Sequence, residues 1–261
     1  MAGATGWTGR AITDAILDSE DLTLAAAVAR KAAGQDVALA IGRAEPCGVA
    51  CVGSVEAALA TCDFDVMIDY TKPEAVKDHT LNALAAGKHV VVGTSGLTAA
   101  DFADIAKEAE RVGKGVVASG NFALTAALMA RFSLMAAQYL DHFEIIDYGK
   151  PTKPDAPSGT ARELAERMGE VKKPVLGHPL DQIIGERELR GGTINGVQVH
   201  SVRLPSYSAS VTAEFAVPGS RLSLTHDAGT DASIYAEGTL LAARKVSGIK
   251  GLVRGLDNLL D

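Results

Sequence analysis

The chain begins MAGATGWTGRAI, Met1 to Ile12, and this stretch decides the fold class. Gly3, Gly6 and Gly9 are spaced Gly-x-x-Gly-x-x-Gly, a variant of the glycine fingerprint of dinucleotide-binding domains. Such glycines allow a tight turn and let a pyrophosphate approach the N-terminus of the helix that follows. Small residues at any tight strand-to-helix turn give a similar pattern, so the segments downstream must support the assignment.

Those downstream segments alternate between short apolar runs and helical patterns as far as about residue 120. Helices are predicted from near Pro73 to before Gly87, and from Thr98 with Asp101 three residues on. Buried strands are predicted for LTLAAAVAR (22–30), FDVMIDY (64–70), KHVVVGT (88–94) and GKGVVASG (113–120). This alternation implies a parallel sheet covered on both faces, a Rossmann-type doubly wound α/β fold. Almost nothing precedes Gly3, so the first strand is missing, and we expect the sequence to be trimmed at its start.

The pattern changes after residue 122, where we place a domain boundary. A long helix is predicted over residues 121–140, and the strand candidates that follow are HFEIID (142–147), GTINGVQVHSVRL (192–204), SASVTAEFAV (208–217) and RLSLTHDA (221–228). In the third candidate, Val211, Ala213, Phe215 and Val217 alternate with polar residues, as in a half-buried antiparallel strand. A last helix is predicted from about residue 231 to 246. We therefore expect a dinucleotide-binding domain over 1–122, with the C-terminal helix (about 231–261) packed back on it, and an α+β domain over 123–230.

Composition limits the functional class. An apolar fraction of 47% with 22% charged residues is typical of a globular protein, and a net charge of −7 without a basic run argues against nucleic acid. The most apolar window, 121–140, contains Arg131 and is expected to be a buried helix rather than a membrane span. No signal peptide is recognised, and we expect a cytoplasmic protein. Cys47, Cys51 and Cys62 lack companion ligands, so reduced thiols are favoured over a disulfide or a metal site.

The cofactor is chosen by the residues that follow the second strand. Discrimination for NAD uses an acid there to hold the ribose 2′-hydroxyl, whereas the 2′-phosphate of NADP needs positive charge. This chain has Arg30 and Lys31 at that place and no acid until Asp36. NADPH is therefore the preferred cofactor, with NADH possible. The alternative is that both side chains are solvated in a surface loop.

A second binding feature lies in GKPTKPDAPSGTARELAERMGE, residues 149–170. Its prolines stiffen the loop, and apolar residues at helical spacing then begin at Ala161. Ser158 or Thr160 can cap this helix, and Thr160 with Glu163 fits a Thr-x-x-Glu capping box. The positive end of the helix favours an anion, which Lys150 or Lys153 could also reach. The alternative is a capped surface helix with solvated lysines.

Taken together, these segments resemble the dihydrodipicolinate reductase family of lysine biosynthesis, whose members are 4-hydroxy-tetrahydrodipicolinate reductases. The resemblance covers essentially the whole chain and rests on GATGWTGRAI (3–12), DVMIDYTKPEA (65–75), VVVGTSGL (90–97), SGNFALTA (119–126), EIID (144–147) and, most specifically, KPDAPSGTA (153–161). It implies a Rossmann domain and a C-terminal sheet domain that binds substrate and forms homo-oligomers, commonly tetramers.

The resemblance also implies residue roles. Lys153 matches the lysine that donates a proton after hydride delivery to a conjugated cyclic imine. The substrate would be held by Gly159, Thr160, Lys150 and Ser95. The cofactor would be held by Gly3, Ala4, Thr5, Gly6, Trp7, Thr8, Arg30, Lys31, Gly93, Thr94, Ser95, Ser119, Gly120, Asn121 and Phe122.

The substrate half departs from the family pattern. A histidine pair usually stands four and three residues before the lysine, where this chain has Gly149 and Lys150. His142 is too far upstream to replace the pair, and His200 and His226 lie in other predicted strands, where we expect structural roles. The segment THDAGTD (225–231) also lacks the Ser-Arg that commonly follows its histidine.

Three hypotheses follow from this departure. The chain is a dihydrodipicolinate reductase with a modified proton-transfer group, a related reductase of another small imine or keto acid, or a non-catalytic NADPH-binding regulatory module. The first is preferred, and the survival of Lys153, Gly159 and Thr160 argues against the third.

Overall fold

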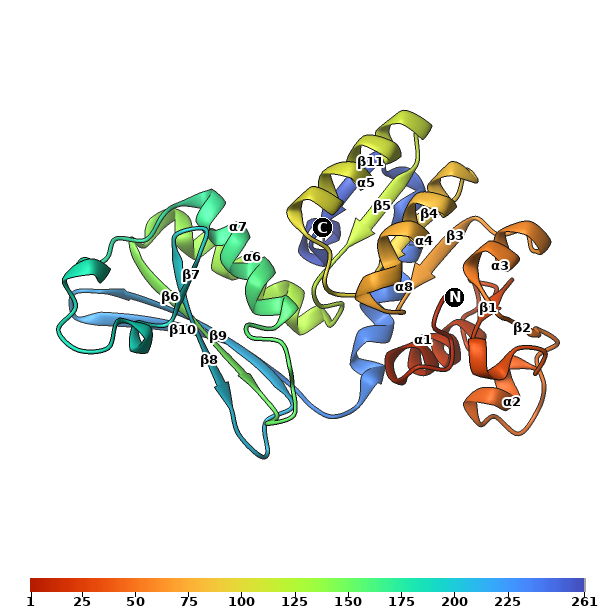
Figure 1. Ribbon diagram of the computed structural model, residues 1–261, viewed down its shortest axis with the longest axis horizontal. Helices are drawn as coiled ribbons and strands as arrows, with labels where there is room; N and C mark the ends of the chain where they lie inside the picture. The colour runs from red at the N-terminus through yellow and green to blue at the C-terminus, as the bar shows by residue number, and fades with distance from the viewer. Residues whose placement is uncertain (261) are drawn as a thin grey trace. The chain divides into compact units, whose positions relative to one another are not determined.

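The computed structural model describes residues 1–260 and divides into two compact units. Unit 1 comprises Met1–Leu124 together with the segment from Ala232 onward, and unit 2 comprises Thr125–Asp231 (Figure 1). Among the described residues, no helix combines the length and the apolar character needed to cross a membrane.

Unit 1 is built on a parallel sheet. Strands β3 (Val66–Asp69), β4 (His89–Val92), β5 (Gly115–Ala118) and β11 (Gly251–Arg254) pair in the order β11-β5-β4-β3, and β1 (Ala27–Val28) pairs with β2 (Cys51–Val52). Ala2 forms parallel bridges to both Val28 and Asp69, so this single residue holds the first-strand position between β1 and β3. The carboxyl ends of these strands therefore share one edge, where ligands of doubly wound sheets bind.

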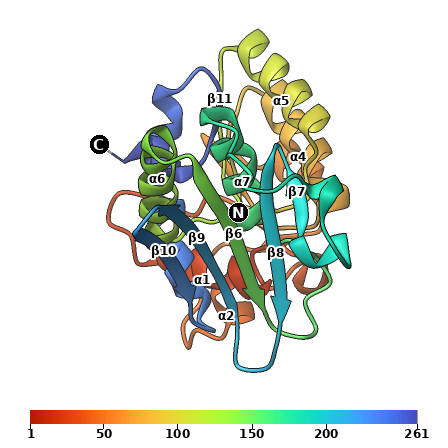
Figure 2. The same cartoon turned by 90° about the vertical axis from the view of Figure 1, so that its left-hand side faces the viewer.

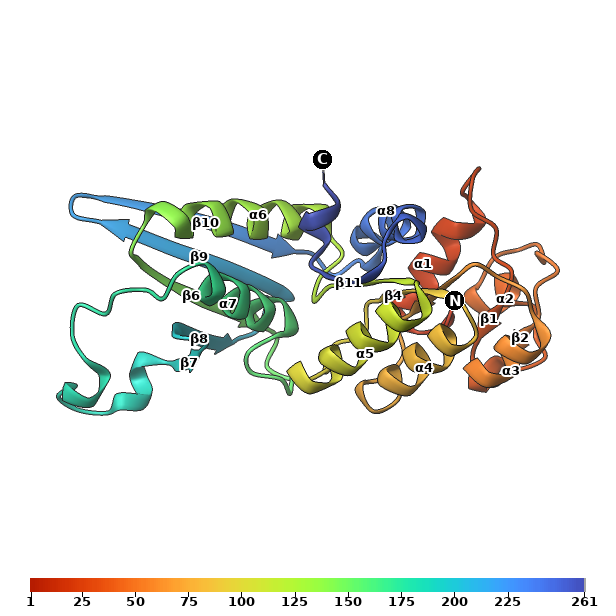
Figure 3. The same ribbon diagram turned by 90° about the horizontal axis from the view of Figure 1, so that it is seen from above.

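Helices cover both faces of this sheet. Figure 3 shows α1 and α8 on one side and α3, α4 and α5 on the other. The helices of this unit are α1 (Trp7–Leu17), α2 (Val37–Ile41), α3 (Val55–Thr61), α4 (Pro73–Ala85), α5 (Ala99–Val112) and α8 (Ala236–Lys245), with 3-10 turns η1 (Arg30–Ala32), η4 (Ala232–Tyr235), η5 (Val246–Gly248) and η6 (Leu256–Leu259). Val76, Val90, Ile105 and Val116 are fully buried, as expected for a sheet covered on both faces.

Most of the predicted elements of unit 1 are confirmed. β3, β4 and β5 lie inside the predicted runs, and α4 and α5 begin where expected, with a reciprocal capping box between Thr98 and Asp101. The prediction of a strand over 22–30 was too long, because only Ala27–Val28 pairs. The last helix, predicted from about residue 231 to 246, is present as α8, but the expectation that helix continues to about residue 261 was wrong. Gly251, at φ 89°, starts a new segment that pairs with β5 as strand β11.

Unit 2 is a mixed sheet with two helices on one face. Figure 2 shows its strands side by side in the order β10-β9-β6-β8-β7. They are β6 (His142–Gly149), β7 (Gly192–Ile194), β8 (Val197–Arg203), β9 (Ala209–Val217) and β10 (Ser220–Ala228), with helices α6 (Leu124–Tyr139) and α7 (Gly159–Val171) and 3-10 turns η2 (Leu180–Gln182) and η3 (Arg187–Arg190). β6 and β8 are parallel and the other pairs antiparallel. Met129 and Met168 from the helices share one core with Phe143 and Phe215 from the strands.

Three local predictions in unit 2 need correction. The single strand predicted over 192–204 is a hairpin, because Asn195 and Gly196 adopt positive φ (48° and 87°), as two-residue hairpin turns require. Ser158 is the N-cap of α7, so Thr160 lies inside the helix and the predicted Thr160 capping box was wrong. Val217 ends its strand 42% exposed rather than buried.

Candidate active site

The glycine turn before α1 is tightly packed against neighbouring backbone. Gly3 lies at φ 81°, and a Cβ there would come 2.3 Å from the Tyr70 carbonyl oxygen. A Cβ on Gly9 would lie 1.8 Å from the Gly3 carbonyl oxygen, so neither position admits a side chain. Gly6 caps α1 without a side-chain hydrogen bond, which leaves the positive end of this helix open to an anion. Thr5 and Thr8 are half-buried and Trp7 is 61% exposed beside this turn.

A buried carboxylate organises the loops after β3 and β4. Asp69 Oδ1 accepts hydrogen bonds from the Thr71 N–H at 2.9 Å and from the Thr94 hydroxyl at 2.7 Å, and Asp69 Oδ2 lies 2.8 Å from His79 Nδ1. The Thr71 N–H also donates to Thr94 Oγ1 at 2.7 Å. Burial would raise the pKa of Asp69, but the hydrogen bonds from His79, Thr94 and Thr71 outweigh burial and hold it below its usual range. The same pairing raises the pKa of His79.

Position 93 has no room for a side chain because the Tyr70 ring lies against it. A Cβ on Gly93 would lie 2.2 Å from the Tyr70 ring, whose hydroxyl is hydrogen-bonded to Thr239 at 2.7 Å. Burial raises the pKa of Tyr70, which keeps this hydroxyl neutral. Ser95, two residues beyond Gly93, is exposed.

The segment after β5 reaches the same edge of the sheet. The Ser119 N–H donates to the Val92 carbonyl at 3.3 Å, and the Asn121 side chain accepts from the Ala123 N–H at 2.9 Å. Ser119, Gly120 and Asn121 are half-buried. Phe122 as a whole residue is only 1% exposed, so it supports the wall of unit 1 and offers almost no surface for the predicted cofactor contact.

Positive charge stands at the carboxyl end of β1. Arg30 and Lys31 are both exposed in η1. The next acid along the chain is Asp36. Its carboxylate caps α2 and accepts hydrogen bonds from the backbone N–H groups of Cys47 and Gly48. This carboxylate is therefore not positioned as a ribose ligand.

Unit 2 presents Lys153 next to the N-terminus of α7. The Lys153 Nζ lies 2.8 Å from the Asp155 carboxylate. The backbone N–H of Lys153 donates to the Lys150 carbonyl at 3.1 Å. Lys150 itself is exposed, while Gly159 and Thr160 form the half-buried first turn of α7. The Ser158 hydroxyl accepts from the Ala161 N–H at 3.2 Å. A cation and a helix N-terminus thus flank one short loop, an arrangement suited to an anionic ligand.

Among the described residues, no histidine is hydrogen-bonded to the Lys153 side chain, whose partner is Asp155. His142 Nδ1 lies 2.8 Å from the Val175 carbonyl, His200 Nε2 lies 2.7 Å from Glu144, and His226 is buried beside the Thr125 hydroxyl at 3.1 Å. Each of these three histidines therefore has a contact within unit 2, and the structural roles expected for His200 and His226 stay predictions. The described residues also contain no cluster of three or more His, Cys, Asp or Glu suited to a metal ion.

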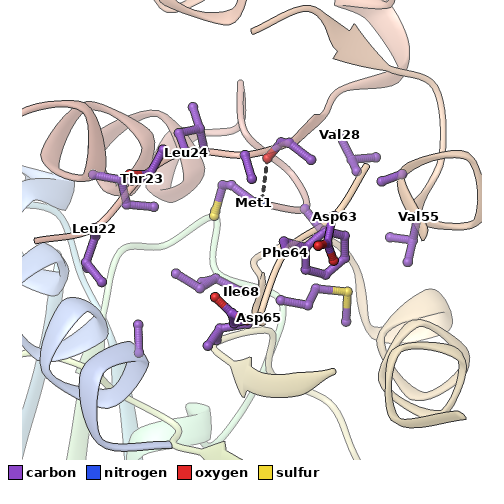
Figure 4. A pocket seen from close by; sticks show the side chains of 18 of the residues that line it. Met1, Leu22, Thr23, Leu24, Val28, Val55, Asp63, Phe64, Asp65 and Ile68 are labelled. Atoms are coloured by element: carbon purple, nitrogen blue, oxygen red, sulfur yellow. Dashed lines mark hydrogen bonds between the residues drawn. The ribbon is translucent and has the colours of Figure 1, made fainter. Parts of the chain in front are cut away.

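A separate cavity of about 330 Å³ lies at the opposite edge of the unit 1 sheet. Figure 4 shows it lined by residues that precede β1 and β3, including Leu22, Leu24 and Phe64. The Met1 nitrogen lies 2.8 Å from the Ala26 carbonyl oxygen beside it. Because it lies at the amino ends of the strands, this cavity is not the cofactor site.

Models of one known protein family match both units of the chain. The family model described as dihydrodipicolinate reductase, N-terminus, matches residues 1–122, and its C-terminus counterpart matches residues 125–260. The chain belongs to the dihydrodipicolinate reductase family. It is 39% identical to the 4-hydroxy-tetrahydrodipicolinate reductase of Desulfitobacterium hafniense (strain DSM 10664 / DCB-2), over 100% of this chain and 97% of that protein. The corresponding protein of Thermosynechococcus vestitus is 36% identical over 100% and 95% of the two chains.

Solved structures extend the comparison to the fold. A dipicolinate-bound dihydrodipicolinate reductase from Paenisporosarcina sp. TG-14 is similar with a TM-score of 0.79 and 31% identity, covering 99% of this chain and 97% of that one. An amine dehydrogenase from Mycobacterium smegmatis, at TM-score 0.69, 13% identity and coverage of 98% and 94%, shares the fold alone. As a member of the dihydrodipicolinate reductase family, the chain is an NAD(P)H-dependent oxidoreductase. The open turn at Gly3 and Gly6 fits the pyrophosphate of such a cofactor.

Sequence reasoning missed the residues whose hydrogen bonds hold the loops that follow β3 and β4. Asp69, Thr71 and His79 form the hydrogen-bonded support of Thr94. An acid at the end of a buried strand followed two residues later by threonine was the available signal. Its partner, a histidine ten residues on, became visible only once α4 was placed against β3.

Proposed function

We propose that this chain reduces a small cyclic imine dicarboxylate with NADPH, and that the substrate is 4-hydroxy-tetrahydrodipicolinate. The observation that carries the proposal is the pairing of Lys153 with the N-terminus of α7, where Asp155 lies 2.8 Å from the lysine ammonium and Ser158 caps the helix. A cationic proton donor beside an anion site suits an imine that carries carboxylates.

In this proposal each group has one task. The first turn of α7, with Gly159 and Thr160, and the Lys150 ammonium bind substrate carboxylates. Loss of the 4-hydroxyl group as water gives the conjugated imine, and NADPH, when bound, would supply the hydride that reduces it. Lys153 gives its proton to the enamine carbon, and the Asp155 carboxylate orients the ammonium for that transfer.

Unit 1 is assigned to the cofactor, with the pyrophosphate on residues 3–8 and the nicotinamide beside Gly93, Thr94, Ser95 and residues 119–122. NADPH is preferred because Arg30 and Lys31 are exposed after β1 while Asp36 is engaged by backbone N–H groups. Arginine forms a planar fork that matches a phosphate, which supports recognition of the 2′-phosphate.

A second candidate is supported by Gly149 and Lys150, which stand where relatives usually have histidines. Reduction of a different cyclic imine or keto acid would use the same lysine and helix. NADPH oxidation with enzymatically generated 4-hydroxy-tetrahydrodipicolinate, beside a panel of cyclic imines and 2-keto acids, separates the two. Turnover on the first substrate supports our proposal, turnover only on another selects the second candidate, and cofactor binding without turnover indicates a non-catalytic module.

We also infer that unit 2 assembles the chain into a homo-oligomer, a tetramer formed through its sheet. Its support is the resemblance together with large apolar side chains left in solvent, above all Ile184 at 101% and Leu189 at 81% exposure. Such side chains commonly mark protein interfaces. A cytoplasmic location is inferred from the free thiols of Cys47, Cys51 and Cys62.

A further inference from the structure

A second buried carboxylate, Asp147, lies at the end of β6 in unit 2. Its side chain is 1% exposed, and its Oδ2 accepts three hydrogen bonds: from the Ser158 N–H at 2.9 Å, from Arg203 Nη2 at 2.7 Å and from the Ser201 hydroxyl at 3.2 Å. A buried charge is tolerated only when it is paired and hydrogen-bonded. Asp147 therefore ties the start of α7 to strand β8.

Arg203 extends this connection into the loop that carries Lys153. Its guanidinium donates to the main-chain carbonyls of Asp147 at 3.2 Å, Val202 at 2.9 Å and Asp155 at 2.6 Å. The planar fork of arginine can hold several acceptors in fixed directions, which a lysine cannot. Arg203 consequently fixes the backbone of Asp155 relative to β6.

Asp155 then completes a chain of contacts to the lysine, because its carboxylate lies 2.8 Å from Lys153 Nζ. From Asp147, one branch runs through Arg203 and Asp155 to Lys153. The other branch runs through the Ser158 N–H to the first turn of α7. One ion pair thus sets the position of both groups assigned to the substrate.

Gly149 provides the space for this arrangement. A Cβ at Gly149 would lie 2.9 Å from Lys153 Cδ and 3.4 Å from both Cδ and Cζ of Arg203. The stems of the two cationic side chains therefore lie over the glycine. Any side chain at this position would have to displace them.

We propose that Arg203, paired with Asp147, is the positioning residue of the substrate site, and that Gly149 allows its guanidinium and the Lys153 stem to lie together there. The inference rests on the proposed function, because Lys153 and α7 are assigned to substrate by that proposal. It adds a group outside the reacting atoms that determines where the proton donor stands.

The test compares Arg203→Ala with Arg190→Ala, which removes another arginine–carboxylate ion pair (with Glu144) from the same unit. We expect Arg203→Ala to lower kcat about 10²-fold, the cost of misplacing a catalytic group by about 1 Å, with an unchanged Kd for NADPH. Added ethylguanidinium should restore much of kcat. Arg190→Ala should keep wild-type kcat. Arg203→Lys should recover only part of the loss, and it replaces Arg203→Ala if the latter does not fold.

Calorimetry on the same variants measures the Kd of dipicolinate. This binding measurement tests the positioning role of Arg203 without relying on catalytic turnover. If the wild type binds dipicolinate but reduces no imine, the proposed function fails. The positioning role then stands if Arg203→Ala weakens dipicolinate binding and ethylguanidinium restores it. Folded Arg203→Ala with wild-type kcat and wild-type dipicolinate affinity overturns the inference, as does a loss that ethylguanidinium does not reverse.

Gly149→Ala supplies an independent check, with Gly177→Ala as control because a Cβ there meets nothing within 4 Å. The first substitution should lower kcat by displacing Lys153, and the second should not. Equal kcat in both variants contradicts the role given to Gly149.

Discussion

At the scale of single residues, the proposed proton donor is Lys153. Its ammonium is held by Asp155 at 2.8 Å, and its side chain is 23% exposed, so a ligand beside it can be reached. The sequence identified this lysine from its motif. The sequence did not show that Asp155 pairs with this lysine, or that Arg203 donates a hydrogen bond to the Asp155 carbonyl.

Lys153→Ala should reduce turnover by about 10²–10⁴-fold, the usual contribution of a general acid, while leaving the Kd of NADPH unchanged. Steady-state kinetics and fluorescence titration measure the two quantities. Lys172→Ala is the matched control, since Lys172 pairs with Asp141 at the same 2.8 Å distance. A wild-type rate in Lys153→Ala would remove this lysine from the mechanism.

Arg30→Ala should weaken NADPH binding and leave NADH binding nearly unchanged. A charge-assisted contact to the 2′-phosphate is worth about 1.5–3 kcal/mol, which corresponds to more than tenfold in Kd. Titration of both cofactors decides, with Arg111→Ala as a control that removes an exposed arginine on α5 paired with Glu108. Equal losses for both cofactors would show that Arg30 does not contact the 2′-phosphate.

At the scale of elements, the strands that are buried on both faces were the most predictable. Apart from Asp69 at the end of β3 and His89 at the start of β4, the strands β3, β4 and β5 consist of apolar residues and glycine, and the burial of those residues follows from composition. β11 escaped prediction because Gly251–Arg254 is short, and it becomes a strand only by pairing with β5. The hairpin at Asn195 and Gly196 was missed although its turn sequence was present.

The loop after β4 depends on Gly93. Gly93→Ala places a Cβ 2.2 Å from the Tyr70 ring and should cost about 1–3 kcal/mol of unfolding free energy, together with a loss of cofactor affinity. Urea denaturation and NADPH titration provide the measurements. Gly53→Ala, which meets nothing within 4 Å in the same unit, should change neither. An unaltered NADPH affinity in Gly93→Ala would contradict the placement of the cofactor beside this loop.

The Asp69–His79 contact predicts a pH-dependent stability. The hydrogen bond to Asp69 raises the pKa of His79 in the folded state, so its contribution is full below the unfolded value of about 6.5 and is lost as pH rises through the folded pKa. The difference in unfolding free energy between wild type and His79→Asn should therefore shrink from about pH 5.5 to 8.5.

His89 serves as the opposite control. It accepts a hydrogen bond from the Gly115 N–H at 2.9 Å, and burial lowers its pKa, with Lys114 adding to the effect. Its contribution is full above about pH 6.5 and is lost as pH falls. If the His79→Asn and His89→Asn differences follow pH in the same direction, the assigned charge states are wrong.

At the scale of the whole molecule, the sequence predicted the fold class and the family, because the motifs run the length of the chain. It could not predict which side chains stabilise the loop that we assign to substrate, because Asp147 and Arg203 come from different strands and meet Ser158 only in the fold. The family resemblance implies a histidine pair where this chain has Gly149 and Lys150. The structure places Lys153 and Arg203 over Gly149 instead.

The tetramer proposed to form through unit 2 is tested by measuring the molar mass of the protein in solution. Light scattering should give about four times the 27.0 kDa of one chain. Because charge in an apolar interface is costly, Ile184→Asp with Leu189→Asp should shift the mass toward that of the single chain. Leu39→Asp, at a 49% exposed position in unit 1, should leave it unchanged. A wild-type mass of 27.0 kDa would contradict the proposed tetramer.

The central claim is tested most directly by the rate of NADPH oxidation with freshly generated 4-hydroxy-tetrahydrodipicolinate, measured for the wild type and for Lys153→Ala side by side. The account predicts rapid oxidation by the wild type and a loss of about 10²–10⁴-fold in the variant. No oxidation by a wild type that binds NADPH, or equal rates in the two proteins, would contradict it.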